Sequence, residues 1–176
     1  PGLSSSKAAQ YISHLSNGMR EAGITTCPRK AAFLAQLAHE SGQLRYFEEI
    51  ASGAAYEGRR DLGNTQPGDG RRFKGRGPIQ LTGRSNYAAA GRALGLNLIA
   101  NPQQVATASV GFRTSLWFWN SRGLSSYADK NSQSSFDQIT RRVNGGYNGK
   151  ADRDQFWRKA AAFLDAKCTR HKFSLP

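Results

Sequence analysis

Glu40 and Glu49 are the two side chains in this sequence whose type and spacing best suit acid–base chemistry. Glu40 belongs to an H-E-S-G motif at the end of a segment with helical apolar spacing, where partial burial would favour the protonated carboxyl group that a general acid needs. Glu49 follows nine positions later. An inverting glycosidase uses such a pair, with the carboxyl groups about 6.5–9.5 Å apart to admit a water molecule. Considered alone, each glutamate is more simply explained as an exposed surface acid.

A third carboxylate, Glu57, is within reach of the same site. Metal chemistry has less support. His39 does not open a zinc motif, because position 43 is Gln and no H-E-x-x-H follows. The two cysteines, Cys27 and Cys168, form no C-x-x-C pair or metal-like cluster. We therefore expect no metal ion and no cofactor.

Two glycine-rich segments carry polar side chains that suit a sugar. Residues 75–87 read GRGPIQLTGRSNY, in which Gln80, Thr82 and Asn86 can hydrogen-bond sugar hydroxyls and acetamides. Their glycines do not form G-x-G-x-x-G and no P-loop lysine follows, so a nucleotide site is poorly supported. The second segment, VNGGYNG at 143–149, is equally well explained as a simple helix cap at its first asparagine.

The elements that must position these residues are expected to be mainly helical. The expected helices run from the Ser4–Ser6 cap to Gly23, from Pro28 to about Phe47, from Asn86 to Leu94, from beyond Pro102 through Trp119, from a capping box at Ser135 to about Val143, and onward from Asp152. The last helix should bury Phe156, Ala160, Phe163 and Leu164. Residues 52–77, with seven glycines, break the pattern and predict a long functional loop region with a short hairpin.

The net charge is +13, from 25 Lys and Arg against 12 Asp and Glu. Such a field favours polyanions: nucleic acid, acidic membranes or the anionic bacterial wall. A nucleic-acid site should show a basic helix or a stacking sheet, whereas the basic residues here are scattered through loops. No apolar run approaches the ~18 residues that would cross a membrane. We therefore expect no nucleic-acid or membrane partner, and a single catalytic domain over residues 1–176 that acts as a monomer.

Cys27 and Cys168 lie near opposite ends of the sequence, each beside a predicted helix. We favour a single disulfide that joins the two end regions, as expected of a secreted, extracellular protein. The alternative is a pair of free thiols in a reducing compartment.

The motifs together resemble glycoside hydrolase family 19, the chitinases and related bacterial-wall lysozymes. H-E-S-G at 39–42 is similar to the family's acid motif, and residues 75–87 resemble its most specific signature, G-R-G-P-I-Q-L-[ST] followed by N-Y. Residues 110–119, 143–146 and 151–153 are similar to its later motifs. Five motifs in the same order are far more specific than any one of them.

The resemblance implies a mainly α, two-lobed, lysozyme-like domain with a small loop or β-hairpin region and a cleft between the lobes. It implies that Glu40 is the general acid, Glu49 the general base and Thr82 the side chain that orients water. The side chains that it places along the cleft for substrate binding are His39, Gln80, Asn86, Asn144 and Arg153.

The sequence departs from the family pattern at several points. Thr82 stands where plant members have Ser, and Gln43 replaces a usual second glycine. The sugar-binding loops of the large plant enzymes are absent. Residues 56–65 resemble the compact bacterial and phage-type branch, in which Glu57 could take the place of Glu49 as base.

The substrate implied is a β-1,4-linked polymer of N-acetylamino sugars, cut internally with inversion. Peptidoglycan is our first expectation, because a basic enzyme gains from an anionic wall and chitin is neutral. Chitin or its oligosaccharides are the alternative substrate. A glycan-binding module that has lost catalysis is the alternative from another class, and the presence of Glu40 argues against it.

Overall fold

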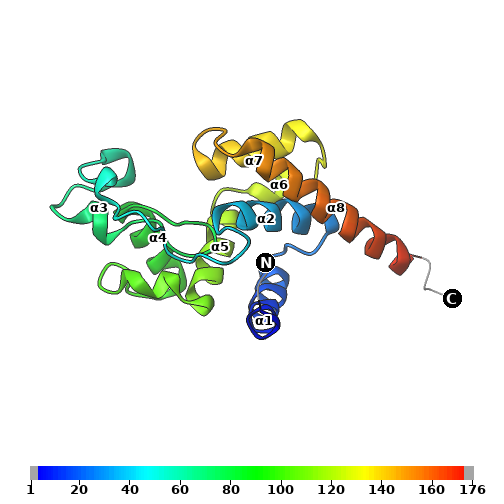
Figure 1. The fold of residues 1–176 in the computed structure, drawn as a ribbon, viewed down its shortest axis with the longest axis horizontal. Helices are drawn as coiled ribbons and strands as arrows, with labels where there is room; N and C mark the ends of the chain where they lie inside the picture. The colour runs from blue at the N-terminus through cyan, green and yellow to red at the C-terminus, as the bar shows by residue number, and fades with distance from the viewer. Residues whose placement is uncertain (1–3, 173–176) are drawn as a thin grey trace.

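The computed structural model describes residues 4–172, with side chains to residue 168, and shows a mainly helical chain (Figure 1). Its elements are α1 (Ser5–Glu21), α2 (Cys27–Glu40), the 3₁₀ turns η1 (Ala54–Tyr56) and η2 (Arg60–Leu62), α3 (Asp69–Arg72), α4 (Arg84–Leu94), η3 (Pro102–Ala106), α5 (Ala108–Ser121), α6 (Leu124–Ala128), α7 (Gln133–Asn144) and α8 (Lys150–Lys172). The mainly α class is as predicted. No helix in the described part of the chain is long and apolar enough to span a bilayer.

The helices form two groups that meet at α5. We call α2, α6, α7 and α8 the helical lobe; α2 packs along α8, and α6 packs on α7 (Figure 1). We call α3, α4 and the turns η1, η2 and η3 the loop lobe, which occupies the opposite end of the molecule (Figure 1). Helix α5 contacts α4 and η3 on one side and α6 on the other, so it links the two lobes.

Helix α2 begins as predicted but ends seven residues earlier than predicted, at Glu40 rather than near Phe47. Thr26 caps its start, and the ring of Pro28 lies in the first turn, where the missing N–H costs nothing. Gly42 and the two residues after it have positive φ angles of 55°, 62° and 63°, a conformation that cannot continue a right-handed helix. Glu40 therefore sits at a free helix end beside a sharp turn.

Helix α7 begins three residues earlier than the capping box proposed at Ser135. Ser132 is the N-cap, and its side chain accepts a hydrogen bond from the backbone N–H of Ser135. The hydroxyl of Ser135 in turn contacts the backbone N–H of Ser132, so Ser135 is the second half of the box. Ser135 occupies the third helical position of the box, where glutamate or glutamine is usual. The prediction took this serine for the N-cap and therefore placed the start of the helix three residues too late.

The long loop region between residues 52 and 77 is ordered by buried and half-buried polar groups rather than by a sheet. The predicted hairpin is reduced to isolated bridges that join Glu48 to Arg76 and Arg76 to Leu81. Asp69 is buried at 1% exposure and accepts hydrogen bonds at 2.7 and 2.8 Å from Arg84, the first residue of α4. The bond from Arg84 lowers the pKa of Asp69 against the opposing effect of burial.

The core is one apolar cluster, in which Trp119 is buried and meets Phe33 edge to face with the ring centroids 5.3 Å apart. The predicted buried side of the last helix is partly wrong, because Phe163 is 62% exposed and lies under the ammonium group of Lys167. The predicted disulfide is confirmed between Cys27 and Cys168, and it joins the start of α2 to the distal part of α8.

Candidate active site

A cavity of about 740 Å³ is lined by residues of both lobes. The helical lobe contributes the ends of α2 and α7, and the loop lobe contributes the segments around residues 46–62 and 79–86. Six of the eight side chains predicted for the site line this cavity: Glu40, Glu49, Gln80, Thr82, Asn86 and Asn144. His39 and Arg153 are not part of the lining and lie behind it.

Glu40 is held by an ion pair that comes from the last helix. Its Oε1 accepts a hydrogen bond of 2.5 Å from Nη2 of Arg153, and its side chain is 17% exposed. Arg153 is buried at 1% exposure and also donates to Gln36 and to the carbonyl of Asn148. Among residues 4–168, no group hydrogen-bonds the second oxygen, Oε2, of Glu40. That oxygen is therefore available to carry a proton.

His39 faces away from the cavity and stabilises the loop that follows α7. Its Nδ1 lies 2.7 Å from a carboxylate oxygen of Asp152. Its ring also packs on Gly149, where a Cβ atom would lie only 2.1 Å from the imidazole. His39 therefore positions the helical wall beside Glu40, and the structure gives it no place along the cavity surface.

Glu49 is fixed by the loop lobe. Its Oε2 accepts a hydrogen bond of 2.7 Å from the backbone N–H of Gly75 and one of 3.2 Å from the hydroxyl of Tyr56. Burial, followed by the charge and hydrogen bond of Glu49, raises the pKa of Tyr56, so this phenol stays a donor. Oε1 of Glu49 has no partner among the described residues. Oε2 of Glu49 is thus held in place, and Oε1 is available to accept a hydrogen bond from a bound molecule.

Gly75 marks the point at which three polar side chains converge. A Cβ atom on Gly75 would lie 2.6 Å from Oε2 of Glu49, 2.8 Å from Oε1 of Gln80 and 3.3 Å from Oγ1 of Thr82. The first glycine of the GRG sequence thus serves close packing at the site, whereas the second, Gly77, packs against Val105 and Gly111. Any side chain at position 75 would displace the oxygens around it.

Gln80, Thr82 and Asn86 form a connected strip along the cavity. Gln80 has a φ of 58°, a strained conformation for a residue other than glycine, and donates from Nε2 to the carbonyl of Gly77. The hydroxyl of Thr82 donates to the carbonyl of Gln80 at 2.9 Å. The amide of Asn86 donates to the carbonyl of Thr82 at 2.8 Å. The backbone carbonyls therefore fix the donor groups and leave the side-chain oxygens of Thr82 and Gln80 as acceptors.

Asn144 is the last residue of α7, and Gly145, at a φ of 78°, is the helix cap. The side-chain oxygen of Asn144 accepts from the backbone N–H of Asn148 at 3.1 Å, so it closes the glycine loop. Asn144 is therefore not the cap residue itself, although its side chain shapes the loop after the helix and also lines the cavity.

The other two acids considered for catalysis are committed to structural contacts. Glu57 lies outside the cavity lining, and its carboxylate oxygens accept hydrogen bonds of 2.7 and 2.8 Å from the backbone N–H groups of Gly68 and Gly70. Glu48 lines the cavity but pairs with Lys74 and Arg76. Burial would raise the pKa of Glu48, but the hydrogen bond from Lys74 and the charge of Arg76 lower it overall. The geometry therefore favours Glu49 as the partner of Glu40.

Sequence reasoning missed Tyr56 and Arg122, which also line this cavity. Tyr56 opens the 56–65 stretch that resembles the compact branch of the family, but that resemblance assigned it no role. Arg122 directly follows the apolar helix α5 and stood in no recognisable pattern. Only the fold brings them beside Glu49 and Asn86.

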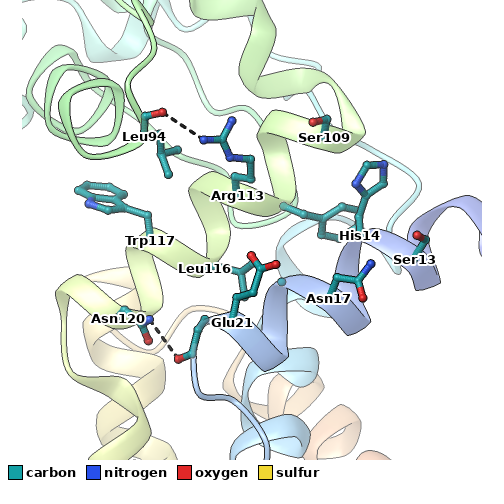
Figure 2. A pocket seen from close by; sticks show the side chains of 13 residues that line it. Ser13, His14, Asn17, Glu21, Leu94, Ser109, Arg113, Leu116, Trp117 and Asn120 are labelled. Atoms are coloured by element: carbon teal, nitrogen blue, oxygen red, sulfur yellow. Dashed lines mark hydrogen bonds between the residues drawn. The ribbon is translucent and has the colours of Figure 1, made fainter.

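A second cavity, of about 550 Å³, lies between α1 and α5 (Figure 2). Its charged side chains are Glu21 and Arg113, and the partly buried Trp117 and the apolar Leu116 form part of its wall (Figure 2). In the described part of the chain, Glu21 has no hydrogen bond or ion pair. One unpositioned carboxylate cannot supply both an acid and a base. None of the predicted site residues lies here.

Comparison with known proteins agrees with the geometry. The sequence profile of glycoside hydrolase family 19, described as chitinase class I, matches residues 13–155. A family 19 domain-containing protein of Haemophilus influenzae is 31% identical over 176 residues, which cover 82% of this chain and 84% of that protein. The Arabidopsis thaliana endochitinase At2g43610 is 44% identical over 117 residues, and the match spans only 39% of its length.

The fold is similar as well. The crystal structure of chitinase C from Streptomyces griseus superposes with a TM-score of 0.70 at 30% identity, covering 87% of this chain and 81% of that one. The profile match runs from α1 to α8 and includes the segments of the H-E-S-G and GRGPIQLT motifs. The resemblance inferred from the motifs is thereby confirmed, and the chain belongs to glycoside hydrolase family 19.

Proposed function

We propose that this protein hydrolyses β-1,4 bonds between N-acetylamino sugars, with inversion at the anomeric carbon, and that chitin or chitooligosaccharides are its first substrate class. The observation that carries the proposal is the pair of carboxylates on opposite lobes of one cavity, each with one anchored and one free oxygen. The named relatives support chitin over peptidoglycan, which reverses our first expectation from the charge.

Glu40 is the general acid in this proposal. Arg153 holds Oε1, so the proton is carried on Oε2 and passes to the oxygen of the departing sugar. The buried guanidinium then stabilises the carboxylate that remains after proton transfer. Gln36 and the carbonyl of Asn148 fix Arg153, so the acid meets the bond in one orientation.

Glu49 is the general base in this proposal. Its free Oε1 accepts a proton from water while Gly75 and Tyr56 hold Oε2. The hydroxyl hydrogen of Thr82 is occupied by the carbonyl of Gln80, so its oxygen can accept the second hydrogen of the same water. With both hydrogens bound, the lone pair of the water is directed at the anomeric carbon from the face opposite Glu40. Inversion follows from this geometry.

A direct test uses a hexamer of β-1,4-linked N-acetylglucosamine. Proton NMR of the first products should show the anomeric configuration opposite to that of the substrate. Products with retained configuration would exclude Glu49 as a base acting on water. Binding of the hexamer without turnover would instead favour a glycan-binding module.

Peptidoglycan remains a second candidate because of the positive charge of the chain and of its cavity. The net charge of +13 has no counterpart in a neutral polymer, and three arginines, Arg59, Arg122 and Arg142, line the cavity. Lysis of bacterial walls, measured beside hydrolysis of the hexamer, compares the two substrates. Turnover of the hexamer alone would remove this candidate.

A further inference from the structure

Arg122 occupies an unusual position for an arginine in the cavity that holds Glu40 and Glu49. It follows α5 directly, and its guanidinium carbon lies 3.5 Å from the centre of the Phe118 ring. Its two hydrogen bonds, to the side-chain oxygens of Asn86 and Ser121, are both long at 3.3 Å. A guanidinium has five N–H donors, so most of its hydrogen-bonding capacity is unused by these contacts.

The charge of Arg122 has no acidic partner among the described residues, although the group is partly buried. Burial alone lowers the pKa of its guanidinium. The ring of Phe118 offsets part of the cost of desolvation through a cation–π contact. A ring attracts the cation but provides no acceptor for its N–H groups, so an anion at this place would gain a charge-assisted hydrogen bond.

The other two arginines of the cavity differ from Arg122. Arg59 pairs with Asp61 at 2.5 Å. Arg142 is exposed, lies over the ring of Tyr127 and donates to its hydroxyl. The first of these charges is paired with a carboxylate and the second is exposed to solvent. Arg122 is thus the one cavity arginine in the described residues that is both partly desolvated and without a carboxylate.

We propose that Arg122, beside Asn86, forms a subsite for a carboxylate carried by the substrate, so that the cavity accepts acidic N-acetylamino-sugar polymers of the peptidoglycan type in addition to neutral chitooligosaccharides. This inference rests on the proposed hydrolysis and assigns a specificity residue to its second candidate substrate. Chitin carries no anionic group that could pair with the charge. In peptidoglycan a carboxylate could come from the lactyl ether of the sugar or from the attached peptide, and Arg122 would bind either through the same paired N–H donors.

The subsite differs from a general attraction by the net charge of +13. Exposed charges act through solvent and are screened within about 3 Å at 1 M salt, whereas a partly buried contact is screened much less. The preference that depends on Arg122 should therefore persist at 1 M salt, where attraction by the surface charge is lost.

The test measures kcat/KM at 1 M salt on three substrates: intact sacculi, glycan strands freed of peptide, and the neutral hexamer. Arg122→Gln should lower the ratio of acidic-substrate to hexamer activity by about 10- to 100-fold, the range for a hydrogen bond to a charged group. Loss on the peptide-free strands identifies the lactyl carboxylate, and loss on sacculi alone identifies the peptide. Converting the substrate carboxylates to methylamides should remove the difference between the variant and the wild type.

Arg113→Gln is the matched control, because it removes one positive charge from α5 in the other cavity, where Arg113 donates to the carbonyl of Leu94 (Figure 2). It should leave the ratio unchanged.

An equal loss on all substrates with Arg122→Gln would overturn the proposal, because Arg122 would then bind an oxygen common to every substrate. If the wild type cleaved neither acidic glycan nor hexamer, the proposed hydrolysis itself would fail. Should Arg122→Gln not fold, the effect of methylamidation on the wild type decides, and a change below twofold rejects the subsite.

Discussion

The two cavities that flank α5 differ less in size than in how they hold their acids. The cavity that holds Glu40 and Glu49, which we call the catalytic cavity after its proposed role, measures about 740 Å³, and the α1–α5 cavity measures about 550 Å³. Glu40 and Glu49 are each anchored through one oxygen by donors from distant segments, whereas Glu21 has no partner among the described residues. Volume and aromatic walls are common to both. The comparison indicates that carboxylates fixed through one oxygen, with the other oxygen free, are what support a proposal of catalysis in the first cavity and not in the second.

The largest effect is expected from the acids of the catalytic cavity. Glu40→Gln should lower turnover of the hexamer by 10²–10⁴-fold, because an amide cannot donate the required proton, and Glu49→Gln should act similarly on the water. Circular dichroism and thermal unfolding should show an intact fold. If Glu40→Gln kept more than about a tenth of the wild-type rate, the assignment of the acid would be wrong.

A smaller effect is expected at Gly75, where the side chains of the catalytic cavity leave no room for a Cβ atom. The methyl group of Gly75→Ala would overlap the carboxylate of Glu49 and the amide of Gln80, so these side chains must move. We expect kcat to fall about 10- to 100-fold with little change in thermal stability, since flexible side chains can move aside. In the matched control, Gly146→Ala, the added methyl meets its neighbour at an ordinary 3.6 Å. Similar losses in both variants would contradict this role.

The next effect concerns stability and its dependence on pH. Since the hydrogen bond from Arg84 lowers the pKa of Asp69, the pair contributes fully above the unfolded pKa near 3.8 and loses its contribution as pH falls through the lower folded value. Asp69→Asn should reduce the free energy of unfolding at pH 7 by about 1.5–3 kcal/mol and flatten its acid dependence. Urea denaturation at pH 7 and pH 3 measures both. Asp129→Asn, in the more exposed pair with Arg29, should reduce the free energy of unfolding by much less than Asp69→Asn does.

The smallest effect is expected in the α1–α5 cavity. Glu21→Gln should leave turnover of the hexamer within about twofold of the wild type, because this carboxylate is not positioned by any described residue. The measurement uses the same assay as for Glu40→Gln. A loss approaching that of Glu40→Gln would show that the contrast between the cavities is mistaken.

The parts of the fold that local chemistry determines could be predicted from the sequence. The Ser4 cap, Pro28 in the first turn of α2 and the aperiodic loop after Ser52 are local signals, and each has its expected place. The end of α2 at Glu40 was missed, because its left-handed turn includes Gln43 and Leu44, which are not typical of that conformation. The exposure of Phe163 depends on how far α8 extends beyond its partner helices (Figure 1).

The candidate site was predictable where its residues lie in contiguous motifs. Gln80, Thr82 and Asn86 share one segment, so their meeting needs only a local turn. The anchoring of Glu49 by Tyr56, and the contact of Arg122 with Asn86, depend on tertiary packing that leaves no spacing pattern in the sequence. The net charge was the least informative feature of the sequence. It favoured an anionic bacterial-wall polymer as substrate but did not indicate which arginine would bind it.

The antiparallel pairing of α2 and α8 sets the order in which catalytic competence can arise during synthesis. Cys168 joins the start of α2, and Arg153 contacts Glu40 at its end, although 113 residues separate this acid from its partner. A nascent chain in which Glu40 has emerged from the ribosome but Arg153 has not contains the acid and lacks the group that orients it. Since domains assemble as units and contacts distant in sequence close late, the proposed hydrolytic activity should appear only once α8 has docked on α2.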